Sequence, residues 1–155
     1  SKLTGDGLMA YFPDSLADKA LEAVLLALAR LTEERTMASS TDILRFLFAG
    51  FGITAGKVLV GNIGTISRLD YTLLGDAVNS AARLEGLTRR VIGGKQYAVV
   101  FDQNFQEKLK AFPSRKLGRV LVKGKSQPID LYAPDRPEVI LPELASQLKE
   151  KITAG

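Results

Sequence analysis

Asn79 and Arg83 are the residues whose types and spacing most directly suggest chemistry. They stand four positions apart in a segment that begins with the turn and cap signal Gly75-Asp76, so a helix would place both on one face. An amide and a guanidinium one turn apart can hold an anionic, oxygen-rich group such as a phosphate. An Asn and an Arg at this spacing are also common on an ordinary solvated surface, so the pair alone does not decide between the two interpretations.

Asp6 is a second candidate, because it lies in the tight turn Gly5-Asp6-Gly7 between two short apolar segments. A carboxylate at the tip of a hairpin can bind a metal ion, although Gly-Asp-Gly is also ordinary turn chemistry. The sequence has no histidine and no cysteine, which excludes Ser-His-Asp catalysis, thiolate sites and most zinc sites. Any metal must therefore have oxygen ligands, which favours magnesium or manganese.

The composition indicates one domain with a substantial core, since the chain has 155 residues and is 46% hydrophobic. Its net charge of +4 suits a phosphate-bearing ligand, and no basic run argues for a nucleic-acid partner. The longest apolar runs fall well short of the roughly 20 residues that span a bilayer. We see no signal peptide and expect a cytoplasmic protein, with an anchor elsewhere in the polypeptide left open.

Strands and helices alternate along the chain, which predicts an α+β fold with a mostly antiparallel sheet. Residues 69–74 are expected to form a strand that leads into the helix carrying Asn79 and Arg83. A capping-box-like Ser15-x-x-Asp18 is expected to start an earlier helix. The remaining expected elements are a hairpin over residues 1–12, a helix over 15–35, buried strands over 44–56 and 57–63 with a turn at Gly56-Lys57, a strand over 97–101, a helix over 102–111 that Asp102 can cap, and a final hairpin over 115–132.

The end of the chain differs from the rest. Residues 134–142 are marked by prolines and resemble a linker, and a helical stripe follows at Leu141, Leu144, Leu148 and Ile152. We expect this stripe to pack on the domain rather than against a partner helix. Gly124-Lys125-Ser126 looks like the end of a phosphate-binding P-loop, but that motif needs a glycine where Arg119 stands, and a strand follows instead of a helix.

Four segments resemble the catalytic domain of class III nucleotidyl cyclases, of the bacterial adenylate cyclase type. Together they span roughly residues 2–133, in the order that the family has them. The hallmark segment is matched by residues 71–85, the second metal-binding segment by residues 2–12, the central strands by residues 52–64 and the closing hairpin by residues 122–125 with 128–132. The resemblance assigns residues 1–134 to an N-terminally incomplete cyclase domain and residues 135–155 to a linker and helical tail.

The resemblance implies a ferredoxin-like βαββαβ core that lacks its first strand here, with helices on one side of the sheet. It also implies a reaction in which the ribose 3′-oxygen of ATP attacks the α-phosphorus, so that cyclic AMP forms and pyrophosphate leaves. Such an enzyme must position the reacting atoms and neutralise phosphate charge. Two magnesium or manganese ions per site are implied as cofactors.

Roles for individual residues follow from the same resemblance. Asn79 matches the residue that orients the ribose, and Arg83 matches the arginine that meets charge on the α-phosphate. The other matches are Lys123 for the triphosphate, Lys2 and Thr72 for the adenine base, Asp6 for the metal and, more loosely, Arg68 for phosphate. Guanylate cyclases typically carry a glutamate where Lys2 stands, so Lys2 favours ATP.

The largest departure concerns the metal site, because the family's other metal-binding aspartate would stand before Lys2 and is absent from these residues. We therefore expect the 155 residues alone to have no measurable cyclase activity. The resemblance implies a homodimer whose two sites are shared, with Asp6 from one protomer and Asn79, Arg83 and Lys123 from the other. An upstream sensor or regulatory domain is also implied.

Three alternatives remain. A diguanylate cyclase shares the core fold, but it would need a Gly-Gly-Asp/Glu-Glu-Phe turn, and Gly93-Gly94-Lys95-Gln96 does not supply one. A guanylate cyclase would use the same site with a different base. A non-catalytic cyclase-like module that binds nucleotide or dimerises would tolerate the missing aspartate.

Overall fold

The computed structural model describes residues 2–4, 7–39, 41–65, 68–92, 94–121 and 127–135. For residues 2–4, 62–65, 68–71, 91, 95 and 96 it describes the backbone only. Asp6, Lys123 and the tail after Asp135 therefore lie outside the described residues, as do the side chains of Lys2 and Arg68. Within the described part, no helix has the length and apolar character needed to cross a membrane.

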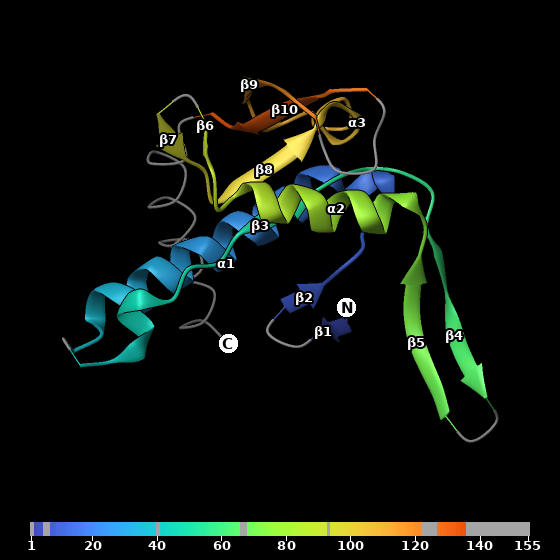
Figure 1. Cartoon of the computed structure of the whole chain (residues 1–155), viewed down its shortest axis with the longest axis horizontal. Helices are drawn as coiled ribbons and strands as arrows, with labels where there is room; N and C mark the ends of the chain where they lie inside the picture. The colour runs from blue at the N-terminus through green and yellow to red at the C-terminus, as the bar shows by residue number, and fades with distance from the viewer. Residues whose placement is uncertain are drawn as a thin grey trace.

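A four-stranded sheet forms the centre of the molecule (Figure 1). Its strands lie in the order β3-β8-β10-β9, and every neighbouring pair is antiparallel except the parallel pair of β3 and β8. The predicted α+β class with a mostly antiparallel sheet is confirmed. The bounds are β3 Phe51–Ile53, β8 Val99–Asp102, β9 Ser114–Val120 and β10 Ile129–Pro134.

Helices α1 (Ala17–Met37) and α2 (Asp76–Leu87) cover opposite faces of this sheet. Val99 and Phe101 of β8 pack with α1, whereas Val100 between them packs with α2. Successive side chains of a strand point to opposite faces, so a strand buried on both sides needs a helix on each. The expectation of helices on one side of the sheet is therefore wrong for this pair.

Glycine allows α2 to approach the sheet closely. A Cβ at Gly52 of β3 would lie 2.1 Å from the backbone nitrogen of Glu85 and 2.3 Å from the carbonyl oxygen of Ala81. Those are backbone atoms inside the helix, so neither can move aside without moving α2. The absence of a side chain at Gly52 thus sets the distance between the helix and β3.

Within the residues that the structure describes, three hairpins lie outside the central sheet (Figure 1). The hairpin of β1 and β2 confirms the one predicted at the start of the chain, and the hairpin of β4 and β5 leads directly into α2. A third, very short hairpin follows α2. Their strands are β1 Lys2–Thr4, β2 Gly7–Met9, β4 Leu59–Thr65, β5 Arg68–Leu74, β6 Val91–Ile92 and β7 Lys95–Gln96.

The predicted pair of buried strands over residues 44–63 is largely wrong. Residues Ile43–Phe46 form the 3-10 helix η2, and only Phe51–Ile53 of the first segment is a strand. The turn at Gly56-Lys57 does not join paired strands, because β3 pairs with β8 and β4 pairs with β5. Leu59 is 76% exposed, so β4 is not a buried strand at its start.

The predicted capping box at the start of α1 is also wrong. A 3-10 helix, η1 (Asp14–Leu16), precedes α1, and the N-cap residue Leu16 makes no side-chain cap. The Asp18 carboxylate instead accepts hydrogen bonds from the backbone nitrogens of Lys110 and Ala111, each at 3.0 Å. Asp18 therefore fastens α1 to the segment that follows α3 (Gln103–Gln106), which is shorter than the helix predicted over residues 102–111.

Candidate functional site

The turn at Gly75 sets the start of α2 and hence the direction of its side chains. Gly75 has φ 150°, and a Cβ there would lie 2.7 Å from the carbonyl oxygen of Lys57. A glycine is needed at such a position because other residues rarely adopt that conformation. The helix that follows places Asn79 on an exposed face and leaves Arg83 half-buried.

Arg83 lies on the wall of a cavity of about 450 Å³ beside α2. That volume falls within the roughly 300–1,000 Å³ of typical small-molecule sites. The wall is rich in polar groups from α2, from the connection after β3, from α3 and from the start of β10. The lining residues are Thr54, Ala55, Gly56, Lys57, Asp76, Ala77, Ser80, Arg83, Asp102, Asn104, Gln127 and Ile129.

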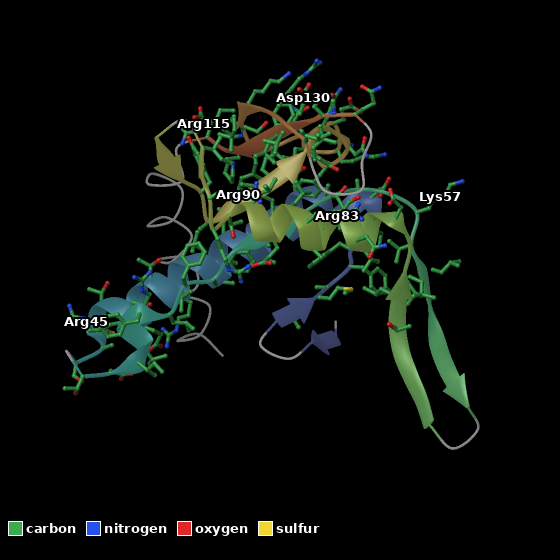
Figure 2. All side chains as sticks on the ribbon, viewed as in Figure 1. Arg45, Lys57, Arg83, Arg90, Arg115 and Asp130 are labelled. Atoms are coloured by element: carbon green, nitrogen blue, oxygen red, sulfur yellow. The ribbon has the colours of Figure 1, made fainter. Side chains whose placement is uncertain are left out.

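The charges on this wall differ in how they are held. Figure 2 shows Arg83 on α2, while Lys57 is exposed and extends outward from the connection between β3 and β4. Asp102 is only 8% exposed. Its Oδ2 accepts a hydrogen bond from the Thr54 hydroxyl at 2.5 Å, and its Oδ1 accepts one from the backbone nitrogen of Phe105 at 3.1 Å. This carboxylate therefore holds the connection after β3 and the start of α3 together beside the cavity.

The closing hairpin, whose strands are β9 and β10, also contributes to the cavity. Gln127 and Ile129 line it, and Gln127 is the first described residue after the stretch that contains Lys123. Asp130 on β10 accepts hydrogen bonds from Lys116 Nζ at 2.7 Å and Arg119 Nε at 2.9 Å. These two bonds lower the pKa of Asp130. They also join β9 to β10 at the residue that follows the cavity-lining Ile129.

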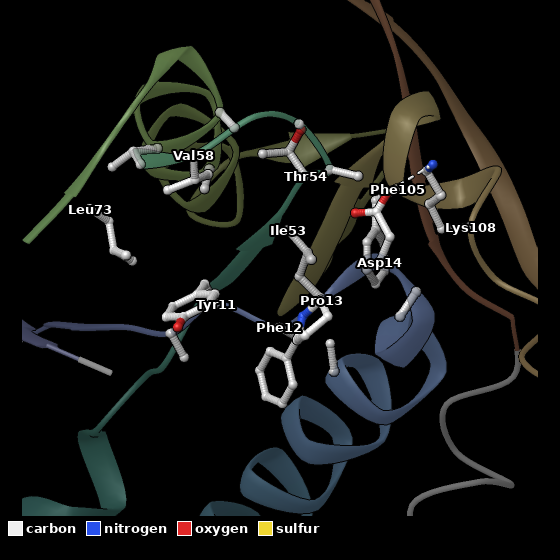
Figure 3. A pocket seen from close by; sticks show the side chains of 18 of the residues that line it. Tyr11, Phe12, Pro13, Asp14, Ile53, Thr54, Val58, Leu73, Phe105 and Lys108 are labelled. Carbon is white, nitrogen blue, oxygen red and sulfur yellow. Dashed lines mark ion pairs between the residues drawn. The ribbon is translucent and has the colours of Figure 1, made fainter. Parts of the chain in front are cut away.

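A second, more apolar cleft lies between the segment after β2, the connection after β3 and the first turns of α2 (Figure 3). Tyr11, Phe12, Ile53 and Leu73 are among its lining residues. At its edge Lys108 forms an ion pair with Asp14 at 2.8 Å, which raises the pKa of Lys108. Because its described cation is already paired, this cleft fits a polyphosphate less well than the Arg83 cavity does.

The predicted site residues are only partly brought together within the described chain. Arg83 lines the cavity, whereas Asn79 and Thr72 are not among its described lining residues. Thr72 lies in β5 opposite Gly61, next to the buried Leu73. Lys2 and Arg68 have their backbones in β1 and β5, and the arrangement of their side chains with Asp6 and Lys123 stays a prediction.

The described residues contain no cluster of three or more His, Cys, Asp or Glu side chains that could hold a metal ion. The candidate ligand Asp6 lies outside these residues. Sequence reasoning also missed Asp102 as a site residue, since it predicted only the helix cap. The Thr54 bond to Asp102 joins two distant segments and has no local sequence signal.

Fold and cavity together define a mixed helix and strand domain with a polar ligand site, where Lys57 and Arg83 lie among the lining residues with Asp76 and Asp102. No family model matches the chain. It is 38% identical over 140 residues to an adenylate cyclase of Anabaena cylindrica, covering 84% of this chain and 27% of that protein. It is 34% identical over 136 residues to the terminal-differentiation specific adenylate cyclase of Dictyostelium discoideum, covering 84% of this chain and 6% of that protein.

A solved bacterial light-regulated adenylyl cyclase superposes on 95% of this chain and 43% of its own, with a TM-score of 0.77 and 32% sequence identity. The chain belongs to the class III nucleotidyl cyclase catalytic domain family. The chain spans 27% and 6% of the length of these two curated relatives.

Proposed function

We propose that this chain is the catalytic domain of an adenylate cyclase that converts ATP to 3′,5′-cyclic AMP and pyrophosphate. The observation that carries the proposal is the half-buried Arg83 on the wall of a cavity whose other groups include the amides of Asn104 and Gln127. Guanidinium and amide donors together suit phosphate oxygens. The names of the curated relatives support cyclase chemistry in particular.

In this proposal the residues divide the substrate among them. Arg83 donates to the α-phosphate, where negative charge grows as the 3′-oxygen attacks. Lys123 and Arg68 bind the remaining phosphates, and Asn79 orients the ribose. Lys2 donates to adenine N1, while the Thr72 hydroxyl accepts from the N6 amine.

Asp6 would supply a carboxylate ligand for magnesium or manganese, ions that prefer oxygen ligands. Bound ions of this kind lower the pKa of a hydroxyl and neutralise phosphate charge. We propose that the second metal-binding aspartate stands on a strand of the same polypeptide before Lys2. The described residues bind and orient the nucleotide. The hydrogen bond between Thr54 and Asp102 keeps these two lining residues in position.

We further propose that two copies of the chain form each site. Asn79 is exposed on the face of α2 directed away from the sheet, so it is available to a nucleotide held against a second copy. Asp6 of one copy and Arg83 of the other would then face the same ATP. An upstream regulatory domain would act by changing how the two copies align.

Formation of cyclic AMP from ATP with Mn²⁺ is the direct test. We expect none from the 155-residue chain and metal-dependent activity from a longer polypeptide that includes the upstream residues. Cyclic AMP made by the 155-residue chain alone would show that no second aspartate is needed. A longer polypeptide that neither binds ATP nor makes cyclic AMP would overturn the proposed function.

Base selection needs a separate test, because a guanylate cyclase would use the same phosphate site. Lys2→Glu in the longer polypeptide replaces a donor to adenine N1 by an acceptor. We expect the rate ratio of ATP to GTP to fall by about tenfold or more, which corresponds to one mismatched hydrogen bond. An unchanged ratio, measured with both nucleotides in competition, would remove Lys2 from the base site.

A further inference from the structure

Large apolar side chains are exposed where α1 ends and η2 begins. Met37 is 77% exposed, Ile43 82% and Phe46 79%. Leu47 and Phe48 follow directly and are 48% and 41% exposed. We call these five residues the η2 patch.

The η2 patch is part of an ordered turn. The Asp42 side chain caps η2 by accepting a hydrogen bond from the Leu44 nitrogen at 2.9 Å. Arg35 of α1 donates from Nε to the carbonyl oxygen of Arg45 at 3.2 Å, which ties η2 to the helix. The chain thus presents apolar side chains to solvent from an anchored segment, and exposed apolar groups of this kind are typical of interaction surfaces.

The same chain contains an element of suitable chemistry. Leu141, Leu144, Leu148 and Ile152 recur at helical spacing in the tail, which lies outside the described residues. A helix over residues 141–152 would show one aliphatic stripe and charged residues elsewhere, so it would gain stability only by covering its stripe.

The tail starts from a fixed point on the described chain. Asp135 is held by a hydrogen bond of 2.9 Å from its nitrogen to the Pro113 carbonyl oxygen. In Figure 1, β10 ends toward the side of the molecule to which α1 and η2 run. Residues 136–140 can span up to about 17 Å, and a helix over residues 141–152 adds about 18 Å.

We propose that residues 141–152 form an amphipathic helix whose aliphatic stripe docks on the η2 patch of the same chain. A short tether gives the tail an effective concentration on the order of millimolar at the patch, so it outcompetes a second copy at ordinary protein concentrations. The proposal does not depend on cyclase activity.

The absence of cysteine makes a thiol-labelling test clean. Phe46→Cys introduces the single thiol at the patch, and its labelling rate by a maleimide is compared with and without residues 136–155. We expect the tail to slow labelling about tenfold, because thiol reactivity follows exposure. Leu148→Asp in the complete chain should restore the fast rate, which guards against misfolding of the truncated chain.

Two matched positions serve as controls. Leu59→Cys is on β4 with a similar exposure of 76%, and its rate should not change on truncation. Val100→Cys is fully buried and should stay slow in every variant, which reports an intact core. Equal labelling of Phe46→Cys with and without the tail would overturn the proposal. Protection that disappears on dilution would also overturn it, because the cover would then be a second copy.

Discussion

Arg83 is the residue on which the proposed chemistry can be tested most sharply. Its guanidinium is half-buried on the cavity wall, so its loss removes a donor that no described neighbouring cation replaces in the same position. We expect Arg83→Ala in the catalytically complete polypeptide to lower kcat by about 10²–10³ with a much smaller change in KM for ATP. Steady-state kinetics with ATP and Mn²⁺ measure both constants.

Arg90→Ala is the matched control, because Arg90 is an exposed arginine just after α2 and does not line the cavity. Its kcat should stay within about twofold of the unchanged protein, as expected for a surface substitution. An equal loss in both variants would mean that the effect of Arg83→Ala is not local to the cavity.

The Asp18 carboxylate should make the free energy of unfolding depend on pH. Hydrogen bonds from the backbone nitrogens of Ala111 and Lys110 lower the pKa of its carboxyl below 3.8 in the folded chain. Folding thus favours the charged form of Asp18. Its contribution to the free energy of unfolding is present above the pKa that Asp18 has in the unfolded chain, and it is lost as the pH falls through the pKa that Asp18 has in the folded chain. Asp18→Ala should lower the free energy of unfolding by about 1–2 kcal/mol at pH 7.

Urea unfolding at pH 7 and at pH 2.5 tests this expectation. The difference between Asp18→Ala and the unchanged chain should shrink at the lower pH, because the contribution of the Asp18 charge falls once the pH drops below the pKa of the unfolded chain. Asp14→Ala is a control for charge alone, since Asp14 makes an exposed ion pair with Lys108 whose removal should cost little. A difference that is the same at both pH values would show that the Asp18 charge is not responsible.

Residue patterns predicted some of this site and could not predict the rest. Asp102 was expected to cap a helix, and its bond from the Phe105 nitrogen confirms that role. The same carboxylate also binds Thr54, because the parallel pairing of β3 with β8 brings the two segments together. The local sequence indicates that Asp102 caps the helix. It does not indicate the bond to Thr54, because that contact depends on the order of the strands.

At the scale of elements, the contact between α2 and β3 sets where Arg83 points. Gly52→Ala would place a Cβ 2.1 Å from the Glu85 nitrogen, so α2 must shift away from the sheet. We expect the free energy of unfolding to fall by about 1–3 kcal/mol, the usual cost of overpacking. Thermal or urea unfolding measures the change.

Gly86→Ala is the matched control inside α2, because a Cβ there meets no atom within 4 Å. Alanine loses less backbone entropy than glycine in a helix, so this variant should be more stable by about 0.5–1 kcal/mol. Destabilisation of both variants to the same extent would argue against a specific contact at Gly52.

The apolar run over residues 44–56 illustrates why element types were harder to predict than their existence. The run was predicted to be a buried strand, yet its first part belongs to η2, where Phe46 is 79% exposed. Apolar content alone does not separate a strand from a short helical turn, because neither has the length to show a clear period. The final hairpin was easier, since its two strands are adjacent in the chain and pair antiparallel.

At the scale of the whole molecule, the sequence indicated the class and left the layers undetermined. The first and the final predicted hairpins and the antiparallel majority are confirmed, whereas α1 and α2 lie on opposite faces of β8. Which face a helix covers depends on the alternation of β8 side chains, and all four residues of β8 are buried. Three consecutive apolar residues in a strand give no preference for one face, so their composition cannot assign the helices.

The proposed pairing of two chains can be tested by mixing variants that are defective in different halves of the site. If Asp6 and Arg83 act on one ATP from different copies, Asp6→Ala and Arg83→Ala are each inactive as homodimers in the catalytically complete polypeptide. A mixed dimer has one site with both defects and one intact site. Random exchange makes half of the dimers mixed, so an equal mixture should recover about a quarter of the unmutated rate.

Cyclic AMP formation is measured before and after the two inactive proteins are mixed at concentrations where dimers exchange. Mixing Arg83→Ala with Asn79→Ala provides the control, because both defects belong to the same half of the site and every mixed dimer lacks an intact site. Recovery in the first mixture and none in the second is the expected result. Failure of Asp6→Ala and Arg83→Ala to complement, with mixed dimers demonstrated, would place both residues in a site built by one chain.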